Sequence, residues 1–187
     1  MVFGDVNPSG KLPFTFPKQL TDSPAHQPGM TFPNRSKVTY EEGIFVGYRW
    51  FDEKDIEPLF AFGHGLSYTT FEYGEAKLDK TSLAGNGTVR LTVKVTNTGS
   101  REGAEVVQLY IADKESSLPR PEKELKDFQK VRLAPGQSAD VTFTIGVDKL
   151  KFYDPSIADW KAEKGDFEAL VGGGSDDIRT RAAFTLK

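Results

Sequence analysis

The sequence predicts a mainly β protein: an immunoglobulin-like β-sandwich preceded by an irregular, proline-rich segment with a short helix. From residue 72 to the C-terminus, short segments alternate apolar and polar residues, with turn residues between them. No helical period runs through this part of the chain. Before residue 60, by contrast, prolines recur and little alternation is visible. Short strands at regular spacing are typical of a sandwich of about seven strands in two sheets.

The N-terminal segment, residues 1–33, is too rich in proline for a helix or a central strand. Lys11–Pro17 alternates in part, but its prolines allow only an edge strand or an extended conformation. Thr21–Met30 is predicted to be a loop. Because a free-standing domain rarely begins in this way, the segment indicates the tail of a larger unit.

A short amphipathic helix is predicted within Val38–Asp52, because apolar residues there recur at helical spacing. These residues are Ile44, Phe45, Tyr48, Phe51 and, with a poorer fit, Trp50. Gly43 and Gly47 weaken the helix prediction, and an extended strand is the alternative. Asp52–Pro58 is predicted to be a charged turn.

The stretch Phe60–Phe71 is aromatic and punctuated by glycine, and it marks the predicted entry into the sandwich. Gly63 and Gly65 bracket His64, which favours a tight turn with positive φ at one or both glycines. The apolar residues of the stretch are expected to be buried where two parts of the chain meet. They are Phe60, Phe62, Leu66, Tyr68 and Phe71. We therefore expect two units, residues 1–59 and residues 60–187.

Seven strands are predicted after this stretch: Tyr73–Leu78, Thr88–Val95, Glu105–Ala112, Leu125–Leu133, Asp140–Ile145, Phe167–Val171 and Ile178–Leu186. Several of them place their apolar residues on one face, as half-buried antiparallel strands do. These core residues are Val89, Leu91, Val93, Val95, Val107, Leu109, Ile111, Val141, Phe143 and Ile145. Leu125, Phe128 and Val131 are expected to anchor their strand, and Trp160 to pack at the edge of the sandwich.

Composition narrows the classes of function. The 187 residues are 37% hydrophobic and 27% charged, which supports a globular protein with a real core. The net charge of -3 gives no sign of a nucleic-acid partner, and no apolar run is long enough to imply a membrane partner. There is no cysteine, and His26 and His64 are too far apart for a metal motif, so no metal or cofactor is expected. The N-terminus lacks the pattern of an export signal, so none is expected.

Several long motifs resemble the C-terminal region of family 3 glycoside hydrolases of the β-glucosidase type. The first two resemble the end of the family's second α/β domain and the segment that follows it. The others resemble the entry into its fibronectin type III-like domain and the body of that domain. In order they are Gly4–Pro17, Tyr40–Asp52, Phe62–Phe71, Val95–Gly99, Gly103–Tyr110 and Arg120–Phe128. The resemblance covers essentially the whole chain and implies a fibronectin type III-like sandwich.

The resemblance also implies that the chain is not an enzyme on its own. In this family the nucleophile is an Asp of an N-terminal barrel domain, and the acid/base is usually a Glu upstream of the matched segment. Neither residue has a counterpart here, so no catalytic residue is assigned. The expected role is a non-catalytic accessory region that stabilises the catalytic domains, in cis or as a separate chain, and shapes substrate access. The parent enzyme could be secreted, periplasmic or cytoplasmic, so the localisation stays unknown.

A segment detached from its domain would leave apolar residues without their native partners. Phe14, Phe16, Phe32 and Phe45 are such residues, so we expect an exposed apolar patch near the N-terminal segment and a tendency to self-associate.

Four residues are candidates for contacting a carbohydrate, either a β-glucoside or a plant polymer. Aromatic faces stack on sugar C–H surfaces and Arg donates to hydroxyls, which selects Tyr48, Arg49 and Trp50. His64 could contact a sugar or fix its turn by a hydrogen bond. The alternative for the first three is that they pack the N-terminal segment onto the sandwich.

Two other functions remain as alternatives: a stand-alone polysaccharide- or lignin-binding module, and an active glycoside hydrolase. A retaining glycosidase needs two carboxyl groups about 5 Å apart. The neighbouring acids lie in polar, turn-like contexts, where a solvated surface role is expected. They are Glu41 with Glu42, Asp52 with Glu53 or Asp55, and Asp176 with Asp177.

Overall fold

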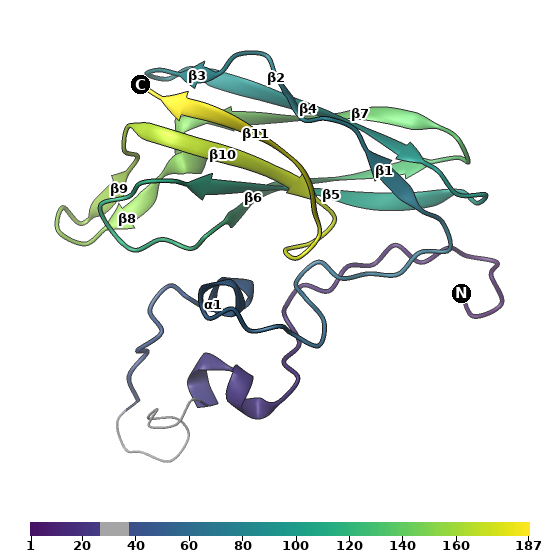
Figure 1. The fold of residues 1–187 in the computed structure, drawn as a ribbon, viewed down its shortest axis with the longest axis horizontal. Coiled ribbons are helices and arrows are strands. Elements are labelled where there is room, and N and C mark those ends of the chain that lie inside the picture. Colours follow the sequence, from purple (N-terminus) through teal and green to yellow (C-terminus); the bar gives the residue numbers. More distant parts are fainter. Residues whose placement is uncertain (27–37) are drawn as a thin grey trace.

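A computed structural model describes residues 1–26 and 38–187, whose strands form two facing sheets and a separate hairpin (Figure 1). The first sheet consists of β1 (Phe71–Tyr73), β2 (Lys77–Leu78), β4 (Thr88–Asn97) and β7 (Ser138–Gly146). The second consists of β3 (Ser82–Leu83), β5 (Gly103–Asp113), β6 (Glu124–Leu133), β10 (Gly165–Gly172) and β11 (Ile178–Leu186). The hairpin is β8 (Phe152–Asp154) with β9 (Asp159–Lys161). The mainly β, fibronectin type III-like sandwich predicted from the sequence is thus confirmed.

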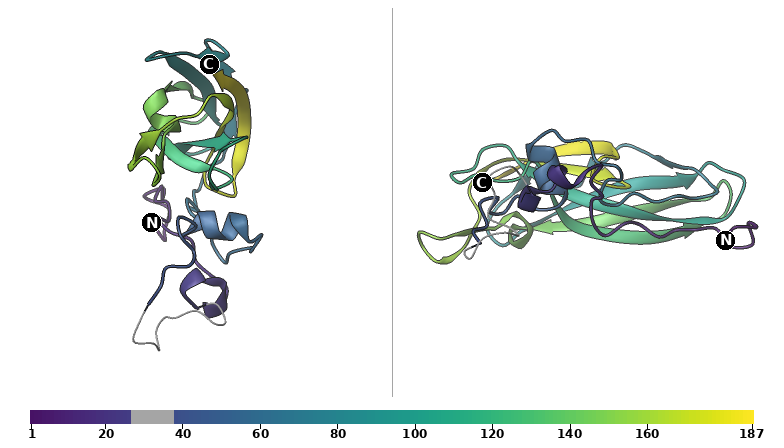
Figure 2. Two further views of the ribbon diagram at one scale, coloured as in Figure 1. Left: turned by 90° about the vertical axis from the view of Figure 1, so that its left-hand side faces the viewer. Right: turned by 90° about the horizontal axis from the view of Figure 1, so that it is seen from below.

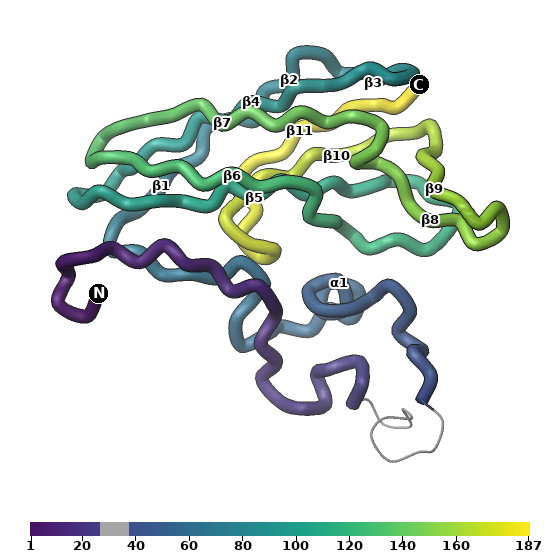
Figure 3. Tube along the Cα trace, turned by 180° about the vertical axis from the view of Figure 1, so that it is seen from behind, coloured from purple at the N-terminus to yellow at the C-terminus, as the bar shows by residue number. Residues whose placement is uncertain are grey.

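Strand pairing is antiparallel except between β11 and β3. In the first sheet, β4 pairs with β7 along one edge and with β1 and β2 along the other. The second sheet has the order β3-β11-β10-β5-β6. A 3₁₀ turn, η3 (Val147–Leu150), leads from β7 to the hairpin. The tube view shows β6 and β7, the edge strands of the two sheets, running along the same side of the sandwich (Figure 3).

The strand predictions need three corrections. The predicted strand Tyr73–Leu78 is two short strands, because the Ala76 amide donates to Thr180 Oγ1 of the second sheet at 2.9 Å instead of continuing the ladder with β4. β3 and β9 are absent from the prediction, since two or three residues are too few to show alternation. β8 lies within Leu150–Pro155, which the sequence predicts only as a short element that ends at a proline. Phe128 does not anchor β6: it is 62% exposed. Phe128 and Val131 are an odd number of positions apart, so the two side chains point to opposite faces of the strand.

The predicted core lies between the two sheets. Val89, Leu91, Val93 and Val95 of β4 have no exposed surface, and Phe143 of β7 is 1% exposed. They pack against buried residues of β5, β10 and β11. Each such side chain contributes about 1.5–3 kcal/mol through burial, so this core is the main stabilising element of the sandwich.

β5 is also buried on its outer face, away from the core. Gln108 is 4% exposed and Tyr110 has no exposed surface, although both side chains point out of the sandwich. Tyr110, Ala112 and Leu170 form a second cluster, packed against Tyr48. The outer face of an antiparallel sandwich is normally exposed to solvent, so another part of the chain must cover the outer face of β5.

The N-terminal layer supplies that cover (Figure 2). It contains 3₁₀ turns η1 (Leu20–Asp22) and η2 (Pro24–His26) and the helix α1 (Tyr48–Glu53). Two passes of the chain run side by side beneath the sandwich: Phe16 bridges Phe60, and Leu12 exchanges backbone hydrogen bonds of 2.8–2.9 Å with Gly63 and His64. The predicted Pro-rich irregular segment with a short helix therefore lies along the outer face of the second sheet.

The helix and the loop differ in detail from their predictions. The helix begins only at Tyr48, because Gly47 has φ +58°, and Ile44 precedes it and is half exposed. Asp52 and Glu53, predicted to be in a turn, belong to the helix. The predicted Thr21–Met30 loop begins with the two 3₁₀ turns. Its remainder, with Phe32 of the predicted apolar patch, lies outside the described residues.

Phe60–Phe71 forms the predicted turn, but not all of its apolar residues are buried. Gly63 has φ +87° and Gly65 does not have positive φ. Phe60, Leu66 and Tyr68 are 42%, 74% and 47% exposed, against the prediction. They are not free of contacts: the Tyr68 hydroxyl donates to the Met1 carbonyl at 3.0 Å, and the Phe60 ring lies 6.1 Å from that of Phe16.

A substitution at Gly63 tests how tightly the N-terminal layer packs against the sandwich. A Cβ on Gly63 would lie 2.7 Å from Gly174 Cα and 2.7 Å from Gln108 Nε2. Gly63→Ala should therefore lower the free energy of unfolding by about 2–5 kcal/mol, from positive-φ strain plus overpacking. Chemical denaturation measures it. The control is Gly136→Ala: φ is +74° but no atom lies within 4 Å, so about 1–2 kcal/mol is expected. Equal losses in the two variants would refute a close-packed junction.

Candidate functional site

Two of the four candidate carbohydrate contacts, Tyr48 and Trp50, pack α1 against its neighbours. The Tyr48 ring lies 5.9 Å from that of Tyr110 and 5.2 Å from that of Phe62, and its hydroxyl accepts a 2.8 Å hydrogen bond from the Leu125 amide. Trp50 is 7% exposed, and its indole N–H donates to the Asp22 carbonyl at 2.9 Å. Tyr48 thus packs α1 onto the sandwich, as the packing alternative expects, whereas Trp50 packs α1 onto η1 within the N-terminal layer.

The other two candidates line different cavities. Arg49 lies 3.5 Å from Glu124 at the edge of one cavity, and its side chain is about one-third exposed. His64 lines another cavity, with its ring 4.9 Å from that of Phe60. The structure therefore does not bring Tyr48, Arg49, Trp50 and His64 into one site. Whether any of them contacts a sugar stays a prediction.

The junction between the N-terminal layer and the sandwich is formed where the turn around Gly63 packs against the loop after β10. The Ser175 amide donates to the Phe62 carbonyl at 2.8 Å, and Gln108 Nε2 donates to the Gly173 carbonyl at 3.1 Å. Tyr110 donates its hydroxyl proton to Gln108 Oε1. The glycine run that ends β10 therefore has a structural use: it lets the loop after β10 touch the Gly63 turn.

A buried ion pair adds to this junction. Lys123 Nζ lies 2.7 Å from Asp52 Oδ2, and both side chains are largely buried. Burial raises the pKa of Asp52, although the hydrogen bond from Lys123 opposes the rise. Asp52 is thus used to attach α1 to the loop before β6, while its neighbours Glu53 and Asp55 are exposed.

The His64 cavity is an open groove of about 760 Å³ on the N-terminal layer. Its lining is mostly apolar and comes from both passes of the chain: Met1, Val6, Pro8, Leu12, Phe16, Phe60 and Leu66, with His64 and Lys11 as its ionisable groups. Leu66 is 74% exposed and Phe60 42% exposed. Phe14, whose ring lies 4.5 Å from that of Phe16, is also more than half exposed. The exposed apolar patch predicted near this segment is therefore present with a different composition: of the predicted residues Phe14 is exposed, whereas Phe16 and Phe45 are partly buried.

The Arg49 cavity is a cleft of about 720 Å³ between the segment before α1, the loop before β6 and the β8–β9 hairpin. Its lining mixes aromatic and charged side chains, among them Phe45, Tyr153 and Trp160. The sequence predicts that Trp160 packs at the sandwich edge, but it is 59% exposed.

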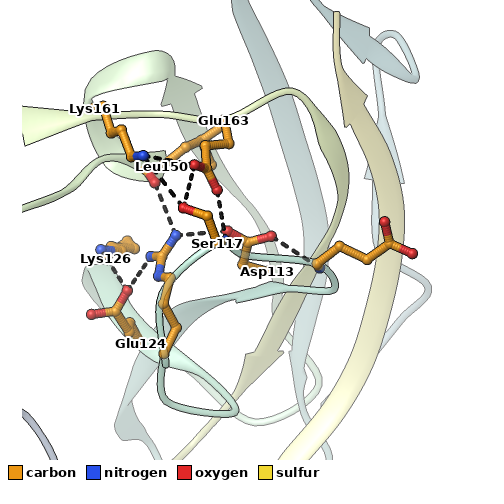
Figure 4. A network of polar contacts seen from close by, with 9 residues as sticks. Asp113, Ser117, Glu124, Lys126, Leu150, Lys161 and Glu163 are labelled. Carbon is orange, nitrogen blue, oxygen red and sulfur yellow. Dashed lines mark hydrogen bonds and ion pairs between the residues drawn. The ribbon is translucent and has the colours of Figure 1, made fainter. Parts of the chain in front are cut away.

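A network of charged groups lies behind this cleft (Figure 4). The Arg120 guanidinium lies 2.8 Å from Asp113 and also contacts Glu124, which lies 3.2 Å from Lys126. Burial alone would raise the pKa of Glu124, but Lys126 and Arg120 hold it below its usual value. Burial raises the pKa of Asp113 despite Arg120. These carboxylates are therefore bound to cations rather than free for proton transfer.

The second part of the network fixes the hairpin. Lys161 Nζ lies 2.7 Å from Asp154 and 2.9 Å from Glu163. The hydrogen bonds from Lys161 and Ser156 lower the pKa of Asp154 to about 2, and those from Lys161 and Ser117 lower the pKa of Glu163 to about 2.

Among residues 1–26 and 38–187, no group of three or more His, Asp or Glu side chains could hold a metal ion. The same residues include no helix that is long and apolar enough to cross a membrane.

Two domain families match the chain in the order of its motifs. The glycosyl hydrolase family 3 C-terminal domain matches residues 1–48, and the fibronectin type III-like domain matches residues 105–175. The chain therefore belongs to the C-terminal region of the family 3 glycoside hydrolases. It comprises the end of their second α/β domain and the fibronectin type III-like domain that follows.

The relatives are β-glucosidases. The chain is 50% identical over 179 residues to thermostable beta-glucosidase B of Acetivibrio thermocellus, and 48% identical over 183 residues to a beta-glucosidase of Bacteroides ovatus. These matches cover 95% and 97% of this chain but 23% and 24% of the relatives, so the chain spans about a quarter of their length.

Solved structures agree with this assignment. A GH3 beta-glucosidase of Bifidobacterium adolescentis superposes with a TM-score of 0.90 at 39% identity, over 100% of this chain and 27% of that one. A beta-glucosidase of Streptomyces venezuelae, solved in complex with D-glucose, superposes with a TM-score of 0.91 at 38% identity. This match covers 100% of this chain and 24% of that one.

The Lys161 network gives a test of the charges behind the cleft. Lys161→Met should raise the pKa of Asp154 and Glu163 from about 2 toward their ordinary values of 3.8 and 4.5. Carboxyl-carbon NMR titration measures both. Because the folded-state pKa values are lowered, the stabilisation is present above about pH 4.5 and is lost as the pH falls toward 2, so the variant should show a shallower acid loss of stability. Ser117→Ala, as a control, should raise only the Glu163 value; values near 2 for both groups in Lys161→Met would contradict the assignment.

Proposed function

We propose that this chain is the non-catalytic C-terminal accessory region of a β-glucosidase-type glycoside hydrolase. It would stabilise the catalytic domains and shape substrate access, and so serve carbohydrate metabolism. The observation that carries the proposal is the apolar groove on the N-terminal layer. Its position supports docking of the catalytic domains, because the lining from Met1 to Phe16 falls within residues 1–48, which match the family 3 C-terminal domain. Phe60 and Leu66 come from the segment that leads into the sandwich.

The groove has the physical character of an interface. Apolar side chains as exposed as Leu66, Phe60 and Phe14 are unfavourable in water, and clustered patches of this kind mark contact sites. Leu66 and Phe60 stand on the rigid turn around Gly63, so the patch is preorganised rather than a loose tail. Without a cover, the same patch would favour self-association.

The carboxylates support a non-catalytic role. Asp52 is held by Lys123, Asp113 by Arg120, and Asp177 by Arg179. A retaining glycosidase needs one free carboxylate and one free acid about 5 Å apart. We accordingly assign no nucleophile or acid/base to this chain, and we keep residues 1–59 and 60–187 as its two proposed units.

An activity assay tests the proposal. The purified chain should release no nitrophenol from an aryl β-glucoside. Added to the catalytic domains of a family 3 β-glucosidase that end before the segment matching Val2, it should bind them and raise their activity or melting temperature. Activity of the chain alone would identify it as a hydrolase and refute the accessory role. Inactivity without any effect on the catalytic domains would refute the docking.

A substitution in the groove sharpens the test. Leu66→Asp places a charge on the apolar surface, and its desolvation should weaken association with the catalytic domains at least about tenfold. The fold should survive, because Leu66 is 74% exposed. Ile157→Asp is the matched control: Ile157 is 57% exposed but lies on the β8–β9 hairpin, outside the groove. Titration calorimetry measures both variants, and equal affinities would place the interface elsewhere.

A further inference from the structure

The cleft beside the β8–β9 hairpin has the features of a ligand site that the docking role does not use. Its volume of about 720 Å³ falls within the roughly 300–1,000 Å³ that ligand pockets occupy. It also lies where two parts of the chain meet, which is a preferred place for such pockets. We propose that this cleft binds a neutral oligosaccharide, with Trp160 and Tyr153 as its aromatic platform.

The platform is a pair of aromatic rings that the fold leaves open. Tyr153 and Trp160 are opposite each other in the hairpin register, and their ring centroids are 6.0 Å apart. The ring planes meet at 73°, so the two rings form a corner in which each presents its own face. They are 50% and 59% exposed, and both line the cleft. Aromatic rings of this size usually bury most of their surface in a fold. Pyranose rings present C–H faces that pack on such surfaces, while their hydroxyls stay free to hydrogen-bond.

The hairpin holds the platform in place before any ligand arrives. Phe152, next to Tyr153, is buried between Arg120 at 5.1 Å and Lys161 at 5.3 Å from its ring centroid. Lys161 is in turn bound to Asp154 across the hairpin. A hairpin backbone fixed in this way has little conformational freedom to lose on binding, which favours affinity for a weakly interacting ligand.

The charges of the lining indicate a neutral ligand. The cleft contains three acidic residues, Glu41, Glu42 and Glu124, and four basic ones, Arg49, Arg120, Lys126 and Lys151. Arg120, Glu124 and Lys126, together with Asp113 outside the lining, form a connected network with two positive and two negative charges. The groups left at its rim carry both signs, so no strong field selects an anion or a cation. Glu42 and Lys151 can accept from and donate to sugar hydroxyls, as mixed polar rims of binding sites do.

Titration of the purified chain with cellotetraose, a neutral β-linked glucose oligomer, tests the proposal. Trp160 is the exposed tryptophan and Trp50 is 7% exposed, so binding should shift the fluorescence of an exposed indole to the blue and protect it from acrylamide. Calorimetry should show saturable binding with a Kd of about 1 mM. Trp160→Ala should weaken binding at least about tenfold, and Trp160→Phe, which keeps a ring face, should recover most of the loss.

An exposed ring outside the cleft provides the matched control. Phe128→Ala removes an aromatic ring that is 62% exposed on β6, outside the cleft, and should leave the affinity unchanged. Because no catalytic domain is present, the result does not depend on the docking proposal. Absence of saturable binding at about ten times the expected Kd would overturn the inference, as would unchanged affinity in a folded Trp160→Ala variant. Equal or tighter binding of tetragalacturonate would overturn the neutral ligand class.

Discussion

The architecture depends on covering the outer face of β5. Tyr110 points away from the sandwich core, yet it has no exposed surface, because Tyr48 packs against it and the Gly63 turn closes beside it. This packing joins the N-terminal layer to the sandwich. It also sets where the two cavities lie. The groove is lined by the two paired segments that contain Leu12 and His64, and the cleft lies between the segment before α1 and the β8–β9 hairpin.

The sandwich could be predicted because each long strand has one face in the core. β4 and β7 alternate along their whole length, so burial is visible in the sequence itself. The short strands β3 and β9 could not be found, since their pairing is set by tertiary contacts. The exposure of Leu66 could not be predicted either, because the sequence does not tell a buried apolar residue from one on a surface that a partner covers.

The candidate site was harder to predict because the type of a residue does not reveal where its side chain points. Tyr48 and Trp50 have the composition of a sugar platform, but they point to the sandwich and to η1. Tyr153 and Trp160 are seven residues apart, and only the hairpin register brings their rings together. Pro155 ends the short element before the turn, but three residues on each side are too few to reveal the pairing in the sequence.

The two backbone passes beneath the sandwich have a mechanical consequence. Leu12 is bonded to the Gly63 turn, and Phe16 to Phe60, so the sandwich is joined to its neighbouring layer by two segments that run side by side (Figure 1). A single peptide linker can swivel about its own dihedral angles, whereas a paired one resists torsion because twisting would break hydrogen bonds. A rotation of the N-terminal layer is therefore transmitted to the sandwich, and the two move together as one stiff body.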